Sequence, residues 1–209
     1  MKLYYHPLSS YCWKVLIALY EAEVTFEPVL VDLSDLKARA ELTALWPFAK
    51  FPVLEADETI FPESSIIIEY LAQNHLGARF LMPVEPELAL AVRQSDRFFD
   101  LYVHDPMQKI VSNRIRPAGT ADTFGEAAAR ATLTTAYKMI ENQMSCRSCA
   151  IGDHFTLADC AAAPALFYAN EVQELNSPNT ISYLERLKAR PSVARVLAEA
   201  EPYFAMFPR

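Results

Sequence analysis

The pattern of apolar residues changes abruptly along this chain, and that change limits the folds open to it. Residues 1–75 alternate short apolar or β-branched runs, bounded by turn formers, with segments of helical spacing. From Leu88 onward, one helical pattern follows another. The expected strands cover residues 3–5, 26–31, 53–55 and 59–61, and the expected helices between them cover residues 11–20, 36–45 and 64–73. The order βαβαββα, followed by helices alone, predicts a chain of the α/β plus all-α class.

Two prolines mark the boundary between the expected domains. Pro83 and Pro86 stand in the stretch 79–87, and proline disfavours helix both at its own position and at the preceding one. We therefore expect an α/β domain over residues 1–78, a linker over residues 79–87 and an all-helical domain over residues 88–209.

The helical domain should begin with a long amphipathic helix that stops or kinks at Pro106. A polar stripe on that helix includes Arg97 and Asp100, which we interpret either as a solvated face or as a surface that meets a second subunit. Later helices are expected at residues 127–144, 157–169, 182–189 and 192–200.

Composition excludes several classes of function. Hydrophobic residues make up 52% and charged residues 22%, which is typical of a globular protein rather than a disordered one. Nineteen basic against twenty-six acidic residues give a net charge of -7 without a basic patch, so we expect no nucleic-acid partner. Only four glycines against fourteen prolines argue against a glycine-rich loop that binds a dinucleotide.

The first ten residues lack the basic and apolar regions of a secretory signal, and no run approaches the roughly 20 apolar residues of a membrane span. We therefore expect a cytoplasmic protein with no membrane partner. Its four cysteines are expected to be free thiols: Cys12, Cys146, Cys149 and Cys160. Cys146 and Cys149 have the spacing of a redox motif, but they fall in an expected loop without the strand-then-helix context of such motifs. No metal is expected, because His6 and His104 have no second ligand at a useful spacing.

The segment between the first expected strand and the first expected helix places hydroxyls and a thiol at a helix N-terminus. Ser9 and Ser10 precede Tyr11 and Cys12 there. Unpaired N–H groups and the positive end of the helix dipole stabilise an anion, and they lower the pKa of a thiol held nearby. Such a site favours a bound thiolate. The alternative, of about equal weight, is that one serine is merely an N-cap.

This strand, turn and helix, with the helix sequence Trp-Lys-Val-Leu-Ile-Ala-Leu, resembles the opening of serine-type glutathione transferases, particularly the theta, zeta and tau classes. The resemblance implies a thioredoxin-like N-terminal domain in which the Ser9 hydroxyl hydrogen-bonds the glutathione sulfur and favours its thiolate. Ser10 is the second candidate for that role. The four positions from Ser9 to Cys12 also resemble the Cys-Pro-Tyr-Cys turn of glutaredoxins, with serine in place of the attacking cysteine. Cys12 is then interpreted as a small structural hydrophobe.

A second segment carries the same resemblance. Residues 46–54 are similar to the family's Asn-Pro-x-x-Lys-Val-Pro-Val-Leu, with Trp46 in place of the asparagine. The resemblance implies that Pro52 is cis, that the Phe51 backbone pairs with the cysteinyl part of glutathione, and that Lys50 meets the glycyl carboxylate. Taken alone, the residues favour an ordinary edge strand that begins with proline.

A third segment, residues 61–71, resembles the family's Glu-Ser-x-x-Ile-x-x-Tyr-Leu helix start. The resemblance implies that the Glu63 carboxylate meets the γ-glutamyl ammonium, and that the hydroxyl and N–H of Ser64 meet the α-carboxylate. A plain helix N-cap explains Ser64 equally well.

A fourth segment lies in the helical half and is structural. Thr156 and Asp159 stand three residues apart, as in a capping box, and Phe155 stands where a hydrophobic staple begins. This segment resembles the signature of the C-terminal domain of the same family.

The resemblance implies a homodimeric transferase that uses glutathione as its cosubstrate and attacks a hydrophobic small-molecule electrophile. Residues assigned from position alone to the electrophile pocket are Tyr11, Phe99, Tyr102, Val103 and Met107. Two alternatives remain open. One is a binding or regulatory protein of the same fold without catalysis, and the other is a glutathione-dependent isomerase like the zeta class.

Overall fold

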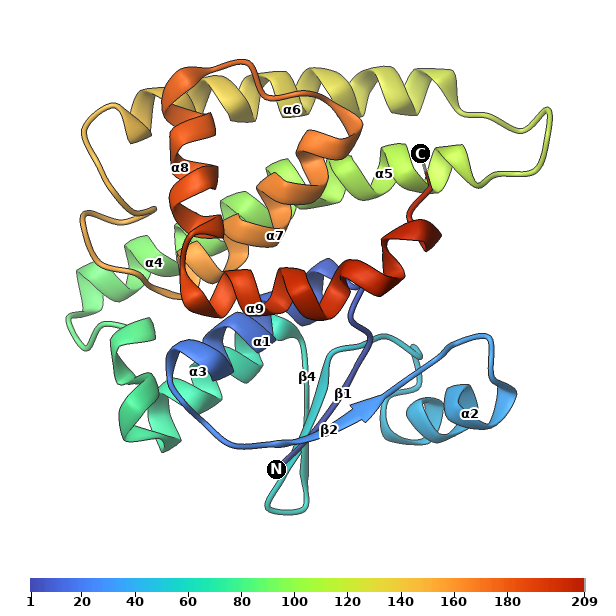
Figure 1. Ribbon diagram of the computed structural model, residues 1–209, viewed down its shortest axis with the longest axis vertical. Helices are drawn as coiled ribbons and strands as arrows, with labels where there is room; N and C mark the ends of the chain where they lie inside the picture. Colours follow the sequence, from blue (N-terminus) through green and yellow to red (C-terminus); the bar gives the residue numbers. More distant parts are fainter. Residues whose placement is uncertain (209) are drawn as a thin grey trace.

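The computed structural model describes residues 1–208, and its first part is a four-stranded mixed sheet (Figure 1). The strands are β1 (Lys2–Tyr5), β2 (Glu27–Leu30), β3 (Val53–Ala56) and β4 (Thr59–Pro62). They lie in the order β2-β1-β3-β4, with β1 parallel to β2 and antiparallel to β3. The expected order βαβαββα is confirmed, and the expected strand ends are within one residue of those in the structure.

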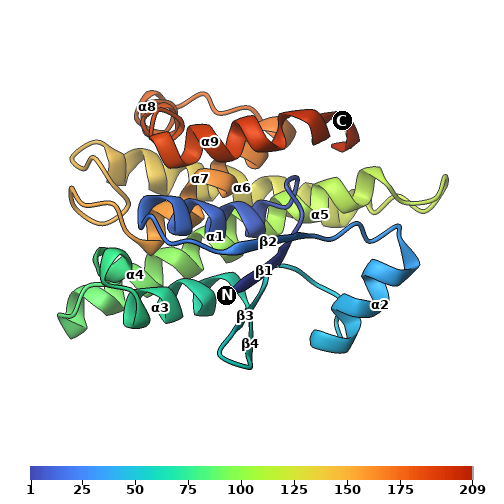
Figure 2. The same cartoon turned by 60° about the horizontal axis from the view of Figure 1, so that its bottom comes forward.

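Three helices accompany the sheet, and two of them face the rest of the molecule. They are α1 (Ser10–Glu21), α2 (Leu36–Leu45) and α3 (Ser64–Asn74), and the short 3-10 helix η1 (Leu76–Leu81) follows them. Figures 1 and 2 show α1 and α3 between the sheet and the helical part, whereas α2 lies apart at the other side of the sheet. Burial agrees with this arrangement, because α1 buries nine of its twelve residues and α2 buries only Leu42.

The remainder of the chain is helical, as predicted. Its elements are α4 (Pro86–Phe98), the π-helical turn η2 (Phe99–His104), α5 (Asp105–Arg114), α6 (Thr123–Met144), α7 (Leu157–Val172), α8 (Pro178–Lys188), α9 (Pro191–Ala200) and the 3-10 helix η3 (Glu201–Met206). Helix α7 is the centre of this part and packs against α1, α4, η2, α5 and α8. Its alanines have small side chains, so the neighbouring helices can approach closely.

Pro86, which was expected to lie in a linker, is instead part of a helix. Helix α4 starts at Pro86, because a proline in the first helical turn gives up an N–H that would have no intrahelical partner anyway. With η1 ending at Leu81, only residues 82–85 of the expected linker lie outside helices. Pro106 was expected to stop or kink the helix. The helix does not stop there, since α5 begins at Asp105, but it is irregular just before the proline, where η2 is a π-helical turn.

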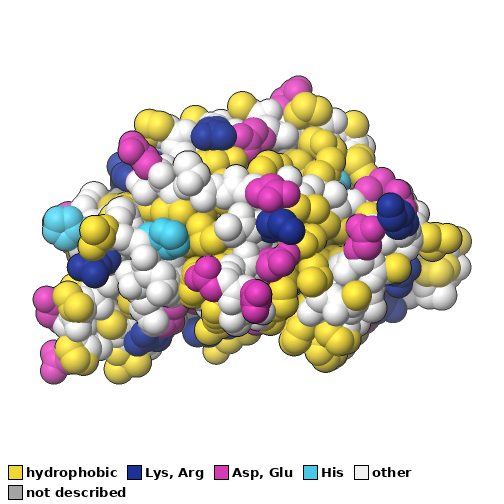
Figure 3. Space-filling view, turned by 90° about the horizontal axis from the view of Figure 1, so that it is seen from below, with side chains coloured by type: hydrophobic (Ala, Val, Ile, Leu, Met, Phe, Trp, Pro, Cys, Tyr) yellow, Lys and Arg dark blue, Asp and Glu magenta, His cyan; other side chains and the backbone are white. Residues whose placement is uncertain are grey.

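One hydrophobic core joins the sheet-containing part to the helical part. Leu3 of β1, Trp13 of α1 and Leu166 of α7 all belong to it and are at most 1% exposed. Seen from below, in Figure 3, the surface intersperses acidic and basic side chains with apolar ones. Within residues 1–208, no helix has both the length and the apolar character to cross a membrane, and no group of three or more possible metal ligands occurs.

The capping box predicted at the start of α7 is present. The Thr156 side chain accepts from the backbone of the first turn, and the Asp159 carboxylate accepts from the Thr156 N–H at 2.9 Å. Asp159 is fully buried, and its other oxygen accepts from the Ala150 N–H at 2.8 Å and from the Tyr183 hydroxyl at 2.7 Å. A single carboxylate therefore ties the helix start to the preceding loop and to α8.

We expect Asp159→Ala to lower the free energy of unfolding by about 3 kcal/mol, because it leaves several buried donors without an acceptor. Urea unfolding followed by circular dichroism measures this change. Asp153→Ala, at an exposed aspartate of the same loop, is the control and should stay within about 0.5 kcal/mol of the parent. An equal effect of the two substitutions would contradict the assignment.

Candidate functional site

A cleft lies where the first turn of α1, the segment before β3, the start of α3 and the turn η2 meet. Its volume is about 170 Å³. The residues that line it are Tyr11, Trp46, Lys50, Phe51, Pro52, Glu63, Ser64, Arg97, Asp100 and Leu101. All five residues predicted to bind glutathione, together with Tyr11, therefore come together from three separate segments of the chain.

The first turn of α1 gives its two serines different surroundings. Ser9 is the half-buried N-cap, and its Oγ accepts from the Cys12 N–H at 3.3 Å. Because a hydroxyl accepts and donates independently, this bond leaves the Ser9 O–H able to donate. Ser10 is only 5% exposed, and its Oγ is hydrogen-bonded to His104 Nε2 of the helical part. Ser9 does not itself line the cleft, although Tyr11, two residues further on, does.

The cysteines lie away from this cleft. Cys12 is fully buried, and burial raises the pKa of its thiol to about 12, which fits the interpretation as a small structural hydrophobe. Cys146 and Cys149 are free thiols in the loop after α6. Burial raises the pKa of the Cys149 thiol as well, so this thiol is not activated for nucleophilic chemistry.

The segment before β3 presents an unpaired stretch of backbone to the cleft. The Phe51–Pro52 peptide bond is cis. Among the described residues, neither the N–H nor the C=O of Phe51 has a hydrogen-bond partner. Both groups are therefore able to pair with a peptide-like ligand, as a neighbouring strand would. The neighbouring Lys50 is exposed at the rim of the cleft.

The start of α3 differs from the simple N-cap considered for Ser64. The N-cap is Glu63, at φ 72° and ψ 116°, and its side chain makes no capping hydrogen bond. Ser64 is instead the first helical residue and is buried beside the cleft. A left-handed φ is costly for a glutamate, and such backbone strain collects at functional sites. The first amides of α3 have no intrahelical acceptors and provide a site for a carboxylate.

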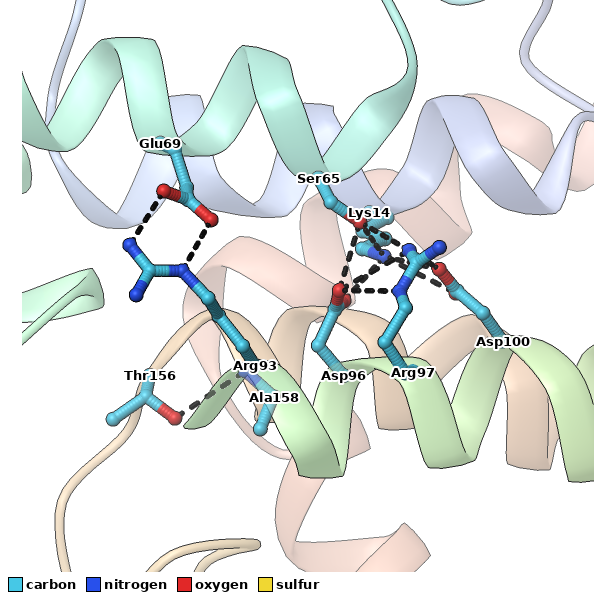
Figure 4. A network of polar contacts seen from close by, with 9 residues as sticks. All are labelled: Lys14, Ser65, Glu69, Arg93, Asp96, Arg97, Asp100, Thr156 and Ala158. Atoms are coloured by element: carbon cyan, nitrogen blue, oxygen red, sulfur yellow. Dashed lines mark hydrogen bonds and ion pairs between the residues drawn. The ribbon is translucent and has the colours of Figure 1, made fainter. Parts of the chain in front are cut away.

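An ionic cluster joins α1 and α3 to the helical part behind the cleft (Figure 4). Lys14 is 1% exposed, and its Nζ forms ion pairs with Asp96 and with Asp100, the latter at 2.9 Å. Arg97 contacts both aspartates, so two cations balance two anions. Burial raises the pKa of Asp100, against the opposing effect of the Lys14 charge.

The cluster also holds the start of α3. Ser65 Oγ accepts from Lys14 Nζ at 2.9 Å and from the Arg97 guanidinium at 2.7 Å, and it donates to Asp96 Oδ2 at 2.8 Å. Arg97 and Asp100 line the cleft and were not predicted as site residues. Their polar stripe was visible in the sequence, but its spacing did not show whether it faced solvent or a cleft.

The five residues assigned to an electrophile pocket do not lie together. Tyr11 lines the cleft, and Tyr102 is 53% exposed in a separate groove between α4, η2 and α6. Phe99, Val103 and Met107 are at most 2% exposed and pack in the hydrophobic core. The structure thus corrects their assignment as pocket walls, because an apolar helical stripe identifies a buried face and does not distinguish a core from a pocket.

We expect Lys14→Met to lower the free energy of unfolding by about 3–5 kcal/mol, because it leaves two buried carboxylates with too little positive charge. The raised pKa of Asp100 means that it takes up a proton on acidification at a higher pH in the folded chain than in the unfolded chain. The deficit should therefore shrink as the pH falls through this range. Urea unfolding at neutral and mildly acidic pH measures both effects.

Lys37→Met, at an exposed lysine of α2, is the matched control and should change the stability by less than about 0.5 kcal/mol. A Lys14→Met deficit that is small, or that grows on acidification, would contradict the burial of charge described above.

Comparisons with known proteins agree with this geometry. Residues 3–79 match the family model for the glutathione S-transferase N-terminal domain, and residues 103–191 match the model for the C-terminal domain. A probable maleylacetoacetate isomerase from Caenorhabditis elegans is 31% identical over 174 residues, which cover 80% of this chain and 78% of that protein.

Two bacterial proteins match over almost their full length. A glutathione S-transferase from Pseudomonas putida is 25% identical over 99% of this chain and 96% of its own. A crystal structure of a glutathione S-transferase from Methylobacillus flagellatus with glutathione bound has a TM-score of 0.86 and 25% identity, and the match covers 93% of this chain and 98% of that one. On these grounds, together with the two domain matches, this chain belongs to the glutathione S-transferase family.

Proposed function

We propose that the cleft binds glutathione and that the protein transfers the glutathione thiolate to an apolar electrophile. The observation that carries this proposal is the convergence of Lys50, the unpaired Phe51 backbone, Glu63 and Ser64 on one cleft beside the N-terminus of α1.

Each end of the tripeptide has a partner of suitable charge. The γ-glutamyl carboxylate meets the free amides of α3 and the Ser64 hydroxyl, while the γ-glutamyl ammonium faces Glu63 and Asp100. The cysteinyl backbone pairs with Phe51 as an added strand would, and Lys50 meets the glycyl carboxylate. Arg97, fixed by Asp96 and Asp100, adds positive charge near the α-carboxylate.

The thiol loses its proton to solvent, and the thiolate is stabilised by the Ser9 O–H and by the positive end of α1. Its sulfur then forms a bond to an electrophilic carbon. The leaving group departs with the electron pair of the broken bond, or, in an addition to an activated double bond, the carbanion takes a proton from water. We propose Ser9 rather than Ser10 for this role, because the Ser10 hydroxyl is already committed to His104.

A glutathione-dependent isomerase is the second candidate, and the 31% identity to the probable maleylacetoacetate isomerase favours it. The same thiolate would then add to the substrate and leave again after bond rotation. Turnover of ring-opened dicarbonyl substrates separates this candidate from conjugation, and glutathione binding without any turnover would favour a silent binding protein.

We further propose that residues 1–78 hold glutathione, that residues 88–209 contribute the electrophile side, and that the protein works in the cytoplasm.

We also propose that the protein is a homodimer. The groove between α4, η2 and α6 has a volume of about 860 Å³ and carries the exposed apolar side chains of Leu101, Tyr102 and Met139. An apolar groove of this size is costly to leave in water. Leu101 also lines the glutathione cleft, so a partner seated on the groove would adjoin the bound tripeptide.

We expect Ser9→Ala to raise the thiol pKa of bound glutathione and to lower kcat by about tenfold or more. The dissociation constant of glutathione should change little at an acidic pH where the bound thiol is protonated in both proteins. The thiol pKa is followed by the ultraviolet absorbance of the thiolate against pH, and binding is followed by calorimetry. Lys50→Ala should behave oppositely, with weaker binding by about tenfold and an unchanged thiol pKa.

Ser34→Ala, at an exposed serine of the loop before α2 that does not line the cleft, is the control and should leave both quantities unchanged. If Ser10→Ala raised the thiol pKa more than Ser9→Ala does, the assignment of the two serines would have to be reversed.

We expect Met139→Glu to shift the protein from dimer toward the 23.6 kDa monomer, because a charge would be buried in the proposed interface. Sedimentation velocity over a range of concentrations measures this. Met206→Glu, at an exposed methionine of η3 outside the groove, is the matched control and should leave the association unchanged. A parent protein that sediments as a monomer at all concentrations would refute the homodimer.

A further inference from the structure

Within residues 1–208, His104 is the only buried histidine, and it lies where the helical part packs against α1. It ends the turn η2 of the helical part and is 2% exposed. Its Nε2 is hydrogen-bonded to Ser10 Oγ, and its ring packs edge-on against Tyr11, with 4.0 Å between the ring centroids. Both contacts are to the first turn of α1, directly after Ser9.

The surroundings of the imidazole keep it uncharged and leave one of its nitrogens unpaired, which costs folding free energy. Burial, with a smaller contribution from the Lys14 charge, lowers the pKa of His104 to about 3, so the ring is uncharged near neutral pH. Its Nδ1 has no hydrogen-bond partner among the described residues. An aliphatic side chain would avoid the penalty of that unpaired nitrogen, and what the imidazole gains in return is the bond to Ser10.

The position of His104 follows from the irregular helix around it. A regular α-helix through residues 99–104 is interrupted by the π-helical turn before Pro106, which changes the direction of the side chains that follow. The turn leaves Val103 and Met107 in the core and places His104 against α1. Turns of this kind are frequent at functional sites.

From this geometry we propose that His104 is a positioning residue for the glutathione thiolate, acting through Ser10 and Tyr11 to hold the first turn of α1. With that turn held from the helical part, the Ser9 O–H and the free amides of α1 keep their direction toward the sulfur. Tyr11, held by the same imidazole, keeps its place in the wall of the cleft. This inference rests on the proposed function, because it concerns the same bound thiolate.

The charged groups around His104 would not themselves change the thiol pKa of bound glutathione when His104 is replaced. Lys14 lies on α1 but is paired with Asp96 and Asp100, and Asp105, next in the chain, is paired with Lys109. Replacement of a neutral imidazole by another neutral side chain leaves all these charges in place. A change in the thiol pKa would therefore report a change in the geometry of the α1 turn.

Four variants of the full-length protein test the proposal: His104→Leu, His104→Gln, Ser10→Ala and the double variant that combines His104→Leu with Ser10→Ala. We expect His104→Leu to raise the thiol pKa of bound glutathione and to lower kcat toward chlorodinitrobenzene about tenfold. The dissociation constant of glutathione, measured at an acidic pH where the bound thiol is protonated in both proteins, should stay within about twofold of the parent. His104→Gln, whose amide reaches the position of Nε2, should bring the thiol pKa and kcat part of the way back to the parent values. Ser10→Ala should give a smaller rise that does not add to that of His104→Leu, because the two substitutions remove the same bond.

Leu133→Ala, a core substitution in α6, is the control for lost stability and should leave the thiol pKa unchanged. If the folded His104→Leu variant keeps the parent thiol pKa, or if its effect and that of Ser10→Ala simply add, the inference is overturned while the proposed function stands. Should His104→Leu fail to fold, the Gln and Ser10→Ala variants decide by the same measurements. Failure of the parent protein to bind glutathione with a lowered thiol pKa would instead overturn the proposed function.

Discussion

The ion pairs of Lys14 with Asp96 and Asp100 are the interaction on which the rest of the site depends. A lysine in full burial is tolerated only when carboxylates neutralise it, and here both carboxylates come from the helical part of the chain. The pairs therefore fix how α1 lies against α4 and η2. They also fix α3, since Ser65 is bonded to Lys14, Asp96 and Arg97 in the same cluster (Figure 4).

The proposed chemistry follows from this arrangement and needs no conformational change of the fold. Two helices, α1 and α3, begin at the cleft with free N–H groups, and the helical part holds each of them close to its N-terminus. The start of α3 suits a carboxylate, and the start of α1 suits a thiolate. The α/β part thus supplies the contacts to glutathione, while the helical part supplies the rigidity, through the ionic cluster at α3 and through His104 at α1.

Much of this could be predicted from local sequence, because strands, caps and turns depend on neighbouring residues. The four strands and the capping box at Thr156 and Asp159 follow short-range patterns. The expectation that Lys50, Phe51 and Glu63 share one site came instead from the resemblance to glutathione transferases, since their local patterns alone favour an edge strand and a helix start. The places of Asp100 and His104 could not be predicted, because a polar stripe on a helix does not reveal what packs against it.

Predictions were wrong where the same sequence pattern is compatible with two different structures. Proline at Pro86 reads as a helix breaker, yet it begins α4, since the first helical turn has no need of its N–H. Phe99 and Met107 were assigned to a pocket wall from their position alone, yet they lie in the core. The π-helical turn between them changes the phase of the helix, and no spacing rule based on a regular helix could have anticipated that change.

A crystal structure of the protein with bound glutathione tests the central claim most directly. The account predicts the glutathione sulfur within hydrogen-bond distance of Ser9 Oγ, the γ-glutamyl carboxylate at the first amides of α3, and Ser10 still bonded to His104. A tripeptide bound elsewhere, or a sulfur contacted by Ser10 after its separation from His104, would contradict it.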